Sequence, residues 1–366
     1  MKQRHTAPGA PLTPTVAAAL LGALLGVLLL TLGSCRPRES AQQVSPVPVS
    51  AEEPEEAATE SGELPEAEPE DNYLSLVAVG DNLFHDVMIR PNQEGGYDFT
   101  GCYTEITPII EAADIAFINQ ETLLGGEAYG FSGYPLFNTP QEVGDALSAA
   151  GFDVINHATN HSMDKGEGAV FATMDYWETM PGIHYLGIYR SQEERDTKKV
   201  IIEKNGIRMG FLSYTYGTNG LALPRDKPYL VSLINDSVIE KEIKALRPLC
   251  DVLTVSMHWG VEYQHTASRE QKRLSRLLAD NQVDLIIGHH PHVLGPYEFL
   301  DRPDGQKTLC FYSLGNFISA QTTGPTQLGG IAFVRIKQHD KNISIEEAGI
   351  IPVVNHYENG LSGFKV

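Results

Sequence analysis

Apolar and polar positions along most of the chain follow the pattern of a protein built from strands and helices. Residues 74–79, Leu-Ser-Leu-Val-Ala-Val, form a short apolar run that ends at Gly80-Asp81, which is typical of a buried strand followed by a loop. Similar apolar runs predict further strands at 115–118, 154–155, 252–257, 283–287 and 309–312.

Helical signals lie between several of these runs. The segment 139–142, Thr-Pro-Gln-Glu, has the form of a capping box and predicts a helix that stops near Gly151. Ser268 opens a second amphipathic helix that reaches about Asp280. Residues 199–214 predict a hairpin that turns at Asn205-Gly206. Strands that alternate with helices, with hairpins near the end, indicate an α/β domain with mixed sheets.

The first 35 residues depart from this pattern. Basic residues precede an apolar run at 16–33, which is either a signal peptide or a helix barely long enough to span a bilayer. The run ends at Leu32-Gly33-Ser34-Cys35, which resembles a bacterial lipobox, so we expect cleavage and lipidation at Cys35. An uncleaved anchor helix is the alternative. Both interpretations tether the remainder to a membrane, outside the cytoplasm.

Residues 36–72 form a different kind of segment. They contain eleven acidic residues, two arginines, several prolines and no aromatic residue. Such a segment cannot bury enough apolar area to offset its chain entropy, and its like charges extend it. We expect a disordered acidic linker here, with a charge-driven interaction tail as the alternative. Residues 73–366 then form the folded domain.

Composition narrows the class of protein. With 42% hydrophobic residues the chain can bury a core, so a wholly disordered protein is excluded. A formal net charge of −20 disfavours nucleic acid as a partner, because the chain repels phosphate backbones. Four cysteines are too few for a disulfide framework. We expect Cys250 and Cys310 to be buried thiols, although one bridge between them is left open, and Cys102 to lie in a loop where it could be exposed.

Polar clusters follow six of the apolar runs, and seven of the twelve histidines lie in them. Because ligands bind beyond the carboxyl ends of strands in open α/β sheets, these side chains could converge on one crevice. Carboxylates, amides and imidazoles are the ligands of divalent metals, and a two-metal centre needs about this many. Taken alone, His258 would be a core histidine and Asp81 a turn or cap residue. Trp259 could stack on a ligand or belong to the core.

The same clusters, in their order along the chain, carry a family resemblance over residues 73–355. They read VGDNLFHD, INQET, NHATNHSMDKG, HWGVEY, GHHPHV and SLGNF. The sequence resembles the CapA/PgsA family of capsule synthesis proteins, associated with poly-γ-glutamate, a branch of the calcineurin-like metallophosphoesterase superfamily. The resemblance implies an αββα sandwich with mixed sheets and a site for two divalent metal ions, from among Mn, Fe and Zn.

The resemblance also implies roles for individual residues. His161 is similar to the histidine that contacts or protonates the reacting group, and Asp164 would orient it or cap a helix. Glu121 stands where a bridging carboxylate is usual, and His289 is the less favoured member of its triplet. The implied metal ligands are Asp81, Glu121, Asn160, His258, His290 and His292, and further candidates are His85, Asn119, Glu262 and Asn316.

Two motifs depart from those of active phosphoesterases. Leu83 occupies the place of a histidine in the first motif, with His85 two residues further on, and the second motif has Asn119-Gln120-Glu121 in place of Gly-Asp. Thr159 also stands at a position that is often Asn in CapA relatives. These departures favour metal binding over phosphatase activity.

Two functions remain open. The first is a metal-dependent hydrolase or transferase that acts on an anionic envelope polymer such as poly-γ-glutamate, cleaving either an amide or a P–O bond. The second is a non-catalytic component of a membrane complex that synthesises and exports the polymer. In both, we expect a lipid-anchored protein at the outer face of a bacterial cell membrane.

Overall fold

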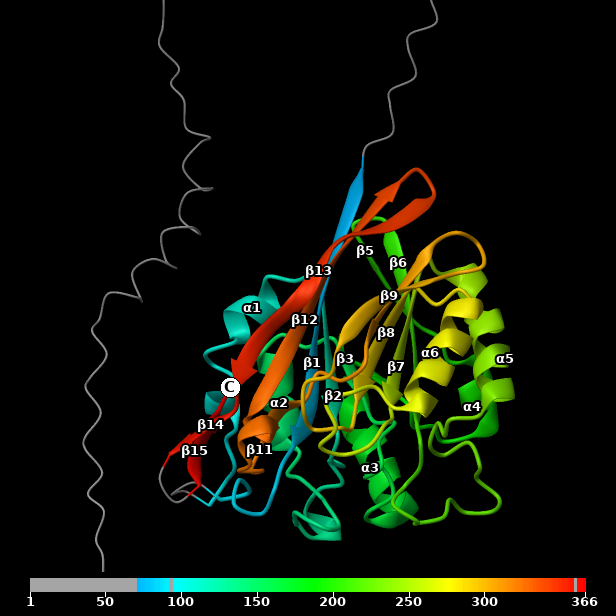
Figure 1. Cartoon of the computed structure of the whole chain (residues 1–366). Coiled ribbons are helices and arrows are strands. Elements are labelled where there is room, and N and C mark those ends of the chain that lie inside the picture. The colour runs from blue at the N-terminus through cyan, green and yellow to red at the C-terminus, as the bar shows by residue number, and fades with distance from the viewer. Residues whose placement is uncertain (1–70, 92–94, 359–360) are drawn as a thin grey trace, which may run out of the picture. The chain divides into compact units, whose positions relative to one another are not determined.

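The computed structural model describes residues 71–366, apart from 92–94 and 359–360. Within these residues a seven-stranded and a six-stranded sheet face each other, and helices cover their outer faces (Figure 1). Both sheets contain parallel and antiparallel pairs. The predicted αββα sandwich with mixed sheets is therefore confirmed.

The first sheet has the order β13-β12-β1-β2-β3-β4, and β11 also pairs with β1. Strands β1 to β4 are parallel, whereas β12 and β13 are antiparallel additions at one side. The strands are β1 (Asn72–Leu83), β2 (Ile115–Gln120), β3 (Val154–Asn156), β4 (His184–Leu186), β11 (Asn316–Ser319), β12 (Leu328–His339) and β13 (Asn342–Val354).

The second sheet has the order β5-β6-β7-β8-β10-β9. Its central strands β6, β7, β8 and β10 are parallel, and β5 and β9 are antiparallel edges. The strands are β5 (Val200–Lys204), β6 (Ile207–Thr215), β7 (Val252–His258), β8 (Leu285–His289), β9 (Tyr297–Asp301) and β10 (Lys307–Phe311). A separate hairpin pairs β14 (His356–Glu358) with β15 (Ser362–Lys365).

Helices pack on both outer faces through apolar residues. Side chains of α1, α2 and α3 join the core on the first sheet, and those of α5 and α6 join the core on the second. The α-helices are α1 (Thr107–Glu111), α2 (Glu142–Ala149), α3 (Gly166–Glu178), α4 (Gln192–Thr197), α5 (Asp236–Leu246) and α6 (Arg269–Asp280). The 3-10 helices are η1 (Thr100–Cys102), η2 (Glu127–Tyr129), η3 (Arg247–Leu249) and η4 (Gly324–Gln327).

Strand β1 shows how the sequence specifies the layers. Leu74, Leu76 and Ala78 pack into the core between the two sheets, whereas Val77 and Val79 pack into the core beneath the helices of the first sheet. Successive side chains of a strand point to opposite faces, so a strand buried on both faces must be apolar at nearly every position. The run at 74–79, apolar at every position except Ser75, is therefore the signature of a central strand in a sandwich.

Two local predictions are confirmed and one is wrong. The Ser268 side chain accepts a hydrogen bond from the Gln271 backbone in a full capping box at the start of α6. The hairpin of β5 and β6 turns at Asn205 and Gly206, both with positive φ. Thr139 caps no helix, because α2 begins at Glu142 and the Thr139 hydroxyl donates instead to the Thr122 hydroxyl.

The cysteines form no bridge among the described residues. Cys250 and Cys310 are buried free thiols, and Cys102 is partly exposed. The predicted signal peptide, with its lipidation at Cys35, lies outside the described residues, as does most of the predicted linker. The end of that linker was placed wrongly, because Asn72 begins β1 and Asp71 lies 2.6 Å from Lys337 Nζ. Within residues that the structure describes, no helix has both the length and the apolar character needed to cross a membrane.

Candidate metal centre

Strands of both sheets end at one edge of the sandwich, and polar residues gather there. Asp81 lies near the end of β1 and Glu121 directly follows β2, both in the first sheet. His258 is the last residue of β7, and the loop after β8 carries His290 and His292, both from the second sheet. All five residues are buried. The parallel course of the central strands in each sheet is what places these strand ends together.

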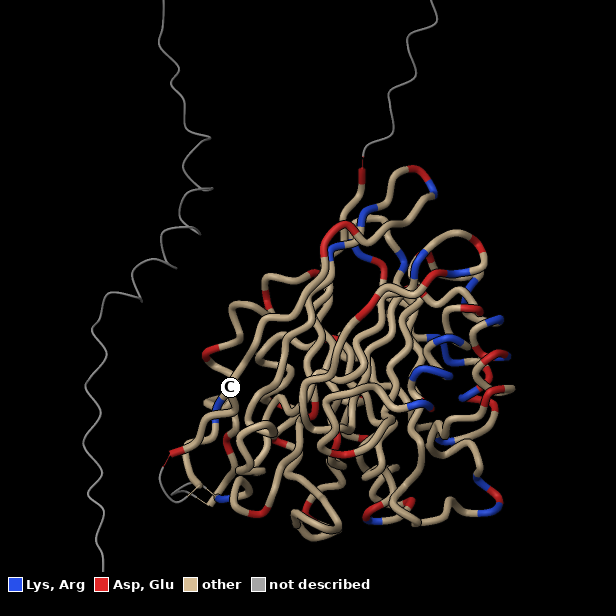
Figure 2. The backbone as a smooth tube through the Cα atoms, in the orientation of Figure 1, with Lys and Arg blue, Asp and Glu red and all other residues tan. Residues whose placement is uncertain are grey.

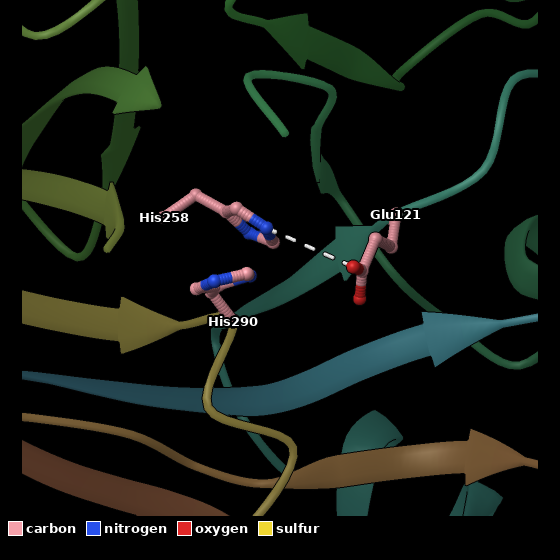
Figure 3. Close-up of side chains that lie close together, drawn as sticks. All are labelled: Glu121, His258 and His290. Carbon is pink, nitrogen blue, oxygen red and sulfur yellow. Dashed lines mark ion pairs between the residues drawn. The ribbon is translucent and has the colours of Figure 1, made fainter. Parts of the chain in front are cut away.

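Glu121 is shared by two groups of potential ligands. One group is Glu121, His258 and His290, and the other is Asp81, Glu121 and His292; within each group the ligand atoms all lie within 4.8 Å of one another. Figure 3 shows the side chains of the first group pointing into one space. Glu121 Oε1 lies 3.7 Å from His258 Nε2, and Oε2 lies 3.9 Å from His292 Nδ1. The two oxygens of one carboxylate therefore face different histidines, as a bridging ligand would.

Asn160 adds an amide oxygen to the first group. Its Oδ1 lies 2.8 Å from His258 Nε2, and its Nδ2 donates to Asn219 Oδ1 at 3.2 Å. The acceptor on Asn219 thus fixes the amide nitrogen of Asn160 on one side, which leaves the amide oxygen on the histidine side. The structure therefore brings together all six residues that the sequence offered as metal ligands.

Neighbouring donors orient the Asp81 carboxylate. Asn119 Nδ2 donates to Asp81 Oδ1 at 2.8 Å, and Asn156 Nδ2 in turn donates to Asn119 Oδ1 at 2.7 Å. The backbone N–H of His290 points at the same carboxylate at 3.3 Å. Asn119, offered as a further candidate ligand, thus supports Asp81 in this arrangement. Such supporting hydrogen bonds are a usual feature of metal sites.

Several buried polar atoms at this edge have no hydrogen-bond partner in the described parts of the chain. Both carboxylate oxygens of Glu121 and Nδ1 of His290 are among them. Buried polar atoms are nearly always paired, so an unpaired carboxylate beside imidazole nitrogens requires a partner. Carboxylate, imidazole and amide donors are the set that Mn, Fe and Zn ions accept. The residues present therefore fit a divalent metal site.

The electrostatics agree with that reading. Burial, followed by the charge of Asp81, raises the pKa of Glu121 well above its ordinary value. Burial opposes ionisation of Asp81 as well, but its hydrogen bond with His292 holds the pKa of Asp81 below the ordinary value. Burial lowers the pKa of His290 to about 3 and that of His258 well below its usual range. Neutral imidazoles have a free lone pair, which is the form that binds metal.

His161 and Asp164 form a hydrogen-bonded pair beside this centre. His161 Nδ1 lies 2.7 Å from Asp164 Oδ2, and His161 Nε2 lies 4.0 Å from Glu121 Oε1. Asp164 Oδ2 also accepts the backbone N–H of Phe137 at 2.7 Å. Asp164 is not the N-cap of α3, which is Lys165. Of its two predicted roles, the geometry therefore matches orientation of His161.

The other candidates lie at the margin of the centre. His85 belongs to none of the metal-binding groups found among the described residues; its Nδ1 lies 3.1 Å from the Leu83 carbonyl oxygen. Asn316 Oδ1 lies 3.0 Å from His292 Nδ1 and orients that ring. Glu262 is exposed, and its carboxylate forms a third group with His290 and His292.

Two other side chains near the centre, His289 and Trp259, are packed among core residues. His289 is buried, and its ring stacks on Phe117 with the ring centres 5.9 Å apart. Trp259 is buried in the core of the second sheet, where its Nε1 donates to the Tyr312 carbonyl oxygen at 3.1 Å. Of the two readings open for Trp259, the core role is the one observed.

Two residues that sequence reasoning missed complete the centre. Asn219 contacts Asn160, and its Nδ2 lies 3.4 Å from His161 Nδ1. The Tyr216 ring lies over His290, with ring centres 4.6 Å apart. Both residues are in the loop after β6. The second strand of the predicted hairpin is also an apolar run followed by polar residues, so the same pattern that indicated the other clusters points to Tyr216 and Asn219.

Comparison with known proteins gives the following matches. The profile of the family described as "Bacterial capsule synthesis protein PGA_cap" matches residues 75–321, more than half of the chain. The "PGA biosynthesis protein CapA" of Bacillus subtilis is 27% identical over 292 residues, which cover 77% of this chain and 74% of that protein. The "Capsule biosynthesis protein CapA" of Bacillus anthracis is 30% identical over 285 residues, which cover 75% of this chain and 66% of that protein.

Solved structures resemble the fold more distantly. The NAD nucleotidase of Haemophilus influenzae superposes with a TM-score of 0.49 and 14% identity, covering 78% of this chain and 56% of that one. The calcineurin-like phosphoesterase YfkN of Bacillus subtilis superposes with a TM-score of 0.45 and 15% identity, covering 78% of this chain and 91% of that one.

Proposed function

Because the chain belongs to the family of bacterial capsule synthesis proteins, we propose that it is a metal-dependent hydrolase or transferase of envelope-polymer synthesis. Its substrate would be an anionic polymer such as poly-γ-glutamate, in line with the names of the two CapA relatives. We propose further that the chain is anchored at the outer face of the cell membrane through Cys35, alongside membrane-bound synthesis or export subunits. The observation that carries the catalytic proposal is Glu121, whose two oxygens face two separate sets of ligands.

The chain's own residues suit a pair of divalent ions. One ion would be held by Asp81, Glu121 and His292, and the other by Glu121, His258 and His290 together with Asn160. When bound, such ions supply Lewis-acid polarisation of a carbonyl or phosphoryl oxygen and an activated water at neutral pH.

His161 would serve as the proton carrier. Asp164 accepts from Nδ1 at 2.7 Å, which fixes the ring and leaves Nε2 facing the centre. A histidine held in this way can donate a proton to a leaving group or accept one from a nucleophile. Asn219 Nδ2 lies 3.4 Å from the same nitrogen and limits the remaining freedom of the ring.

Metal content of the purified full-length chain tests this proposal. We expect two equivalents of Mn, Fe or Zn in the wild type and loss of metal in the double variant His290→Ala/His292→Ala. The double variant His339→Ala/His356→Ala is the matched control, since both of these histidines are exposed and remote from the centre in sequence. A wild type that binds no metal under metal-replete conditions contradicts the hydrolase and transferase roles.

One observation favours the non-catalytic alternative. Leu83 stands where active phosphoesterases place a histidine, and its side chain has no donor atom, so it offers no ligand to an ion beside Asp81. A centre with fewer ligands could grip a polymer chain without cleaving it. Metal-loaded protein that turns over neither phosphoesters nor γ-glutamyl amides would support this role.

A further inference from the structure

A carboxylate and two aromatic rings flank the same two histidines at the mouth of the centre. The ligand atoms of Glu262, His290 and His292 all lie within 4.8 Å of one another, and Glu262 is exposed. The Tyr216 ring lies 4.6 Å from the His290 ring, and the Tyr263 ring lies 6.1 Å from the His292 ring. Tyr216 is 47% exposed and Tyr263 is 55% exposed, so both rings offer surface to a ligand.

Main-chain contacts hold these aromatic residues in place. Tyr263 has a φ of 64°, a left-handed conformation that a bulky residue rarely adopts, and its N–H donates to the Pro291 carbonyl oxygen at 2.8 Å. The N–H of Tyr216 donates to the His258 carbonyl oxygen at 3.0 Å, and its hydroxyl donates to Asn219 at 3.3 Å. Strained conformations of this kind persist where the surroundings determine them, and they concentrate at functional sites.

Lys and Arg are missing from the segments that form the mouth. The segments 216–221, 259–265 and 288–294 contain neither residue type. No Lys or Arg forms an ion pair with Glu262 in the described parts of the chain, and Figure 2 shows basic residues gathered over α5 and α6 instead. A cation would find a carboxylate and two ring faces here.

We propose that Glu262, Tyr216 and Tyr263 form a subsite for a positively charged amine of the ligand. Aromatic faces attract ammonium groups through their quadrupole, and a carboxylate adds a charge-assisted hydrogen bond. The amine would belong either to the amino end of a peptide-like polymer or to an amino sugar. This inference deepens the proposed function, on which it rests, by naming the group recognised beside the metal centre.

Matched pairs of ligands test the subsite by isothermal titration calorimetry on metal-loaded full-length protein. The peptide pair is a γ-linked glutamate tetramer with a free amino end and its N-acetylated form. The sugar pair is a glucosamine tetramer and an N-acetylglucosamine tetramer. In buffer acidic enough to protonate the amines, we expect the free amine to bind about tenfold more tightly than its acetylated match. A preference within one pair alone supports the subsite and identifies the source of the amine.

Variants separate this inference from the proposed function. We expect Glu262→Gln and Tyr263→Leu to lose the amine preference, and Glu240→Gln, an exposed control on α5, to keep it. Equal affinity within both pairs, or no binding of any ligand, overturns the subsite. Metal loss in Glu262→Gln also overturns it, because Glu262 would then be a metal ligand. The proposed function fails on a different result, the absence of metal from the wild type.

Discussion

Nδ1 of His292 lies 3.0 Å from Oδ2 of Asp81, although the two residues come from different sheets. Although burial opposes it, the charges of Glu121 and Asp81 raise the pKa of His292 to about 9. Without metal, the His292 proton is therefore a positive charge beside Asp81 and Glu121, and a divalent ion bound there would displace it. Because buried carboxylates need a neighbouring cation, this arrangement indicates a place suited to a divalent ion.

Replacing Glu121 should have opposite effects without and with metal. Burial and then the charge of Asp81 raise the pKa of Glu121 well above its ordinary value. Keeping this buried side chain in the folded protein at neutral pH therefore costs free energy of unfolding. Without metal we expect Glu121→Gln to raise the free energy of unfolding by about 1–3 kcal/mol. With added Mn, Fe or Zn the wild type should gain stability and the variant should not, as measured by thermal unfolding.

The control for this prediction is Glu240→Gln, an exposed carboxylate on α5. We expect it to show the wild-type gain on addition of metal. An equal metal-dependent gain in Glu121→Gln would contradict the role of Glu121 as a shared ligand.

Asp164→Asn should impair catalysis while leaving metal content unchanged. In the wild type Asp164 Oδ2 accepts from both the Phe137 N–H and His161 Nδ1, and the uncharged oxygen of an asparagine would hold the His161 ring less strongly. We expect turnover of p-nitrophenyl phosphate or γ-glutamyl-p-nitroanilide to fall about 10–100-fold, and about 10²–10⁴-fold in His161→Ala. Turnover in both variants at the wild-type rate would show that this pair carries no proton.

Buried His157 should make stability depend on pH. Trp177 Nε1 donates to His157 Nε2 at 2.7 Å, and burial lowers the pKa of His157 to about 3. Below pH 6.5, the ordinary pKa of histidine, His157 binds a proton in the unfolded chain but stays neutral in the folded chain. Stability is therefore lost progressively as the pH falls from 6.5 toward 3.

His157→Gln removes this titration and keeps an acceptor for Trp177. We therefore expect the stability advantage of the wild type over the variant to shrink by about 2 kcal/mol between about pH 7 and about pH 5. Urea unfolding at several pH values measures the difference. A difference that stays constant with pH would contradict the neutral state of His157.

Gly80→Ala should disrupt the strand that carries Asp81. A Cβ at Gly80 would lie 1.9 Å from the Gly315 carbonyl oxygen, and a backbone atom cannot move away cheaply. We expect the free energy of unfolding to fall by more than about 3 kcal/mol. Gly101→Ala is the matched control, because its Cβ would meet no atom within 4 Å, and it should unfold like the wild type.

Local sequence signals predicted the strands and helices well where one segment decides the outcome. The apolar run at 74–79 forms the expected strand, and the Ser268 capping box begins the expected helix. In both cases the residues that decide the structure lie within a few positions of one another in the sequence. Thr139 failed as a cap because Thr122, seventeen positions away, accepts its hydroxyl. Such a competitor cannot be seen in the local pattern.

The sequence by itself determined which chemical groups follow each strand, and with them the family and a list of candidate metal ligands. Only the tertiary structure decided how those groups meet. Asp81 and Glu121 come from one sheet, whereas His258 and His292 come from the other, and packing of the two sheets joins them. Because contacts between sheets depend on long-range packing rather than spacing along the chain, the sequence could not show that Glu121 faces both groups or that Asn219 reaches His161.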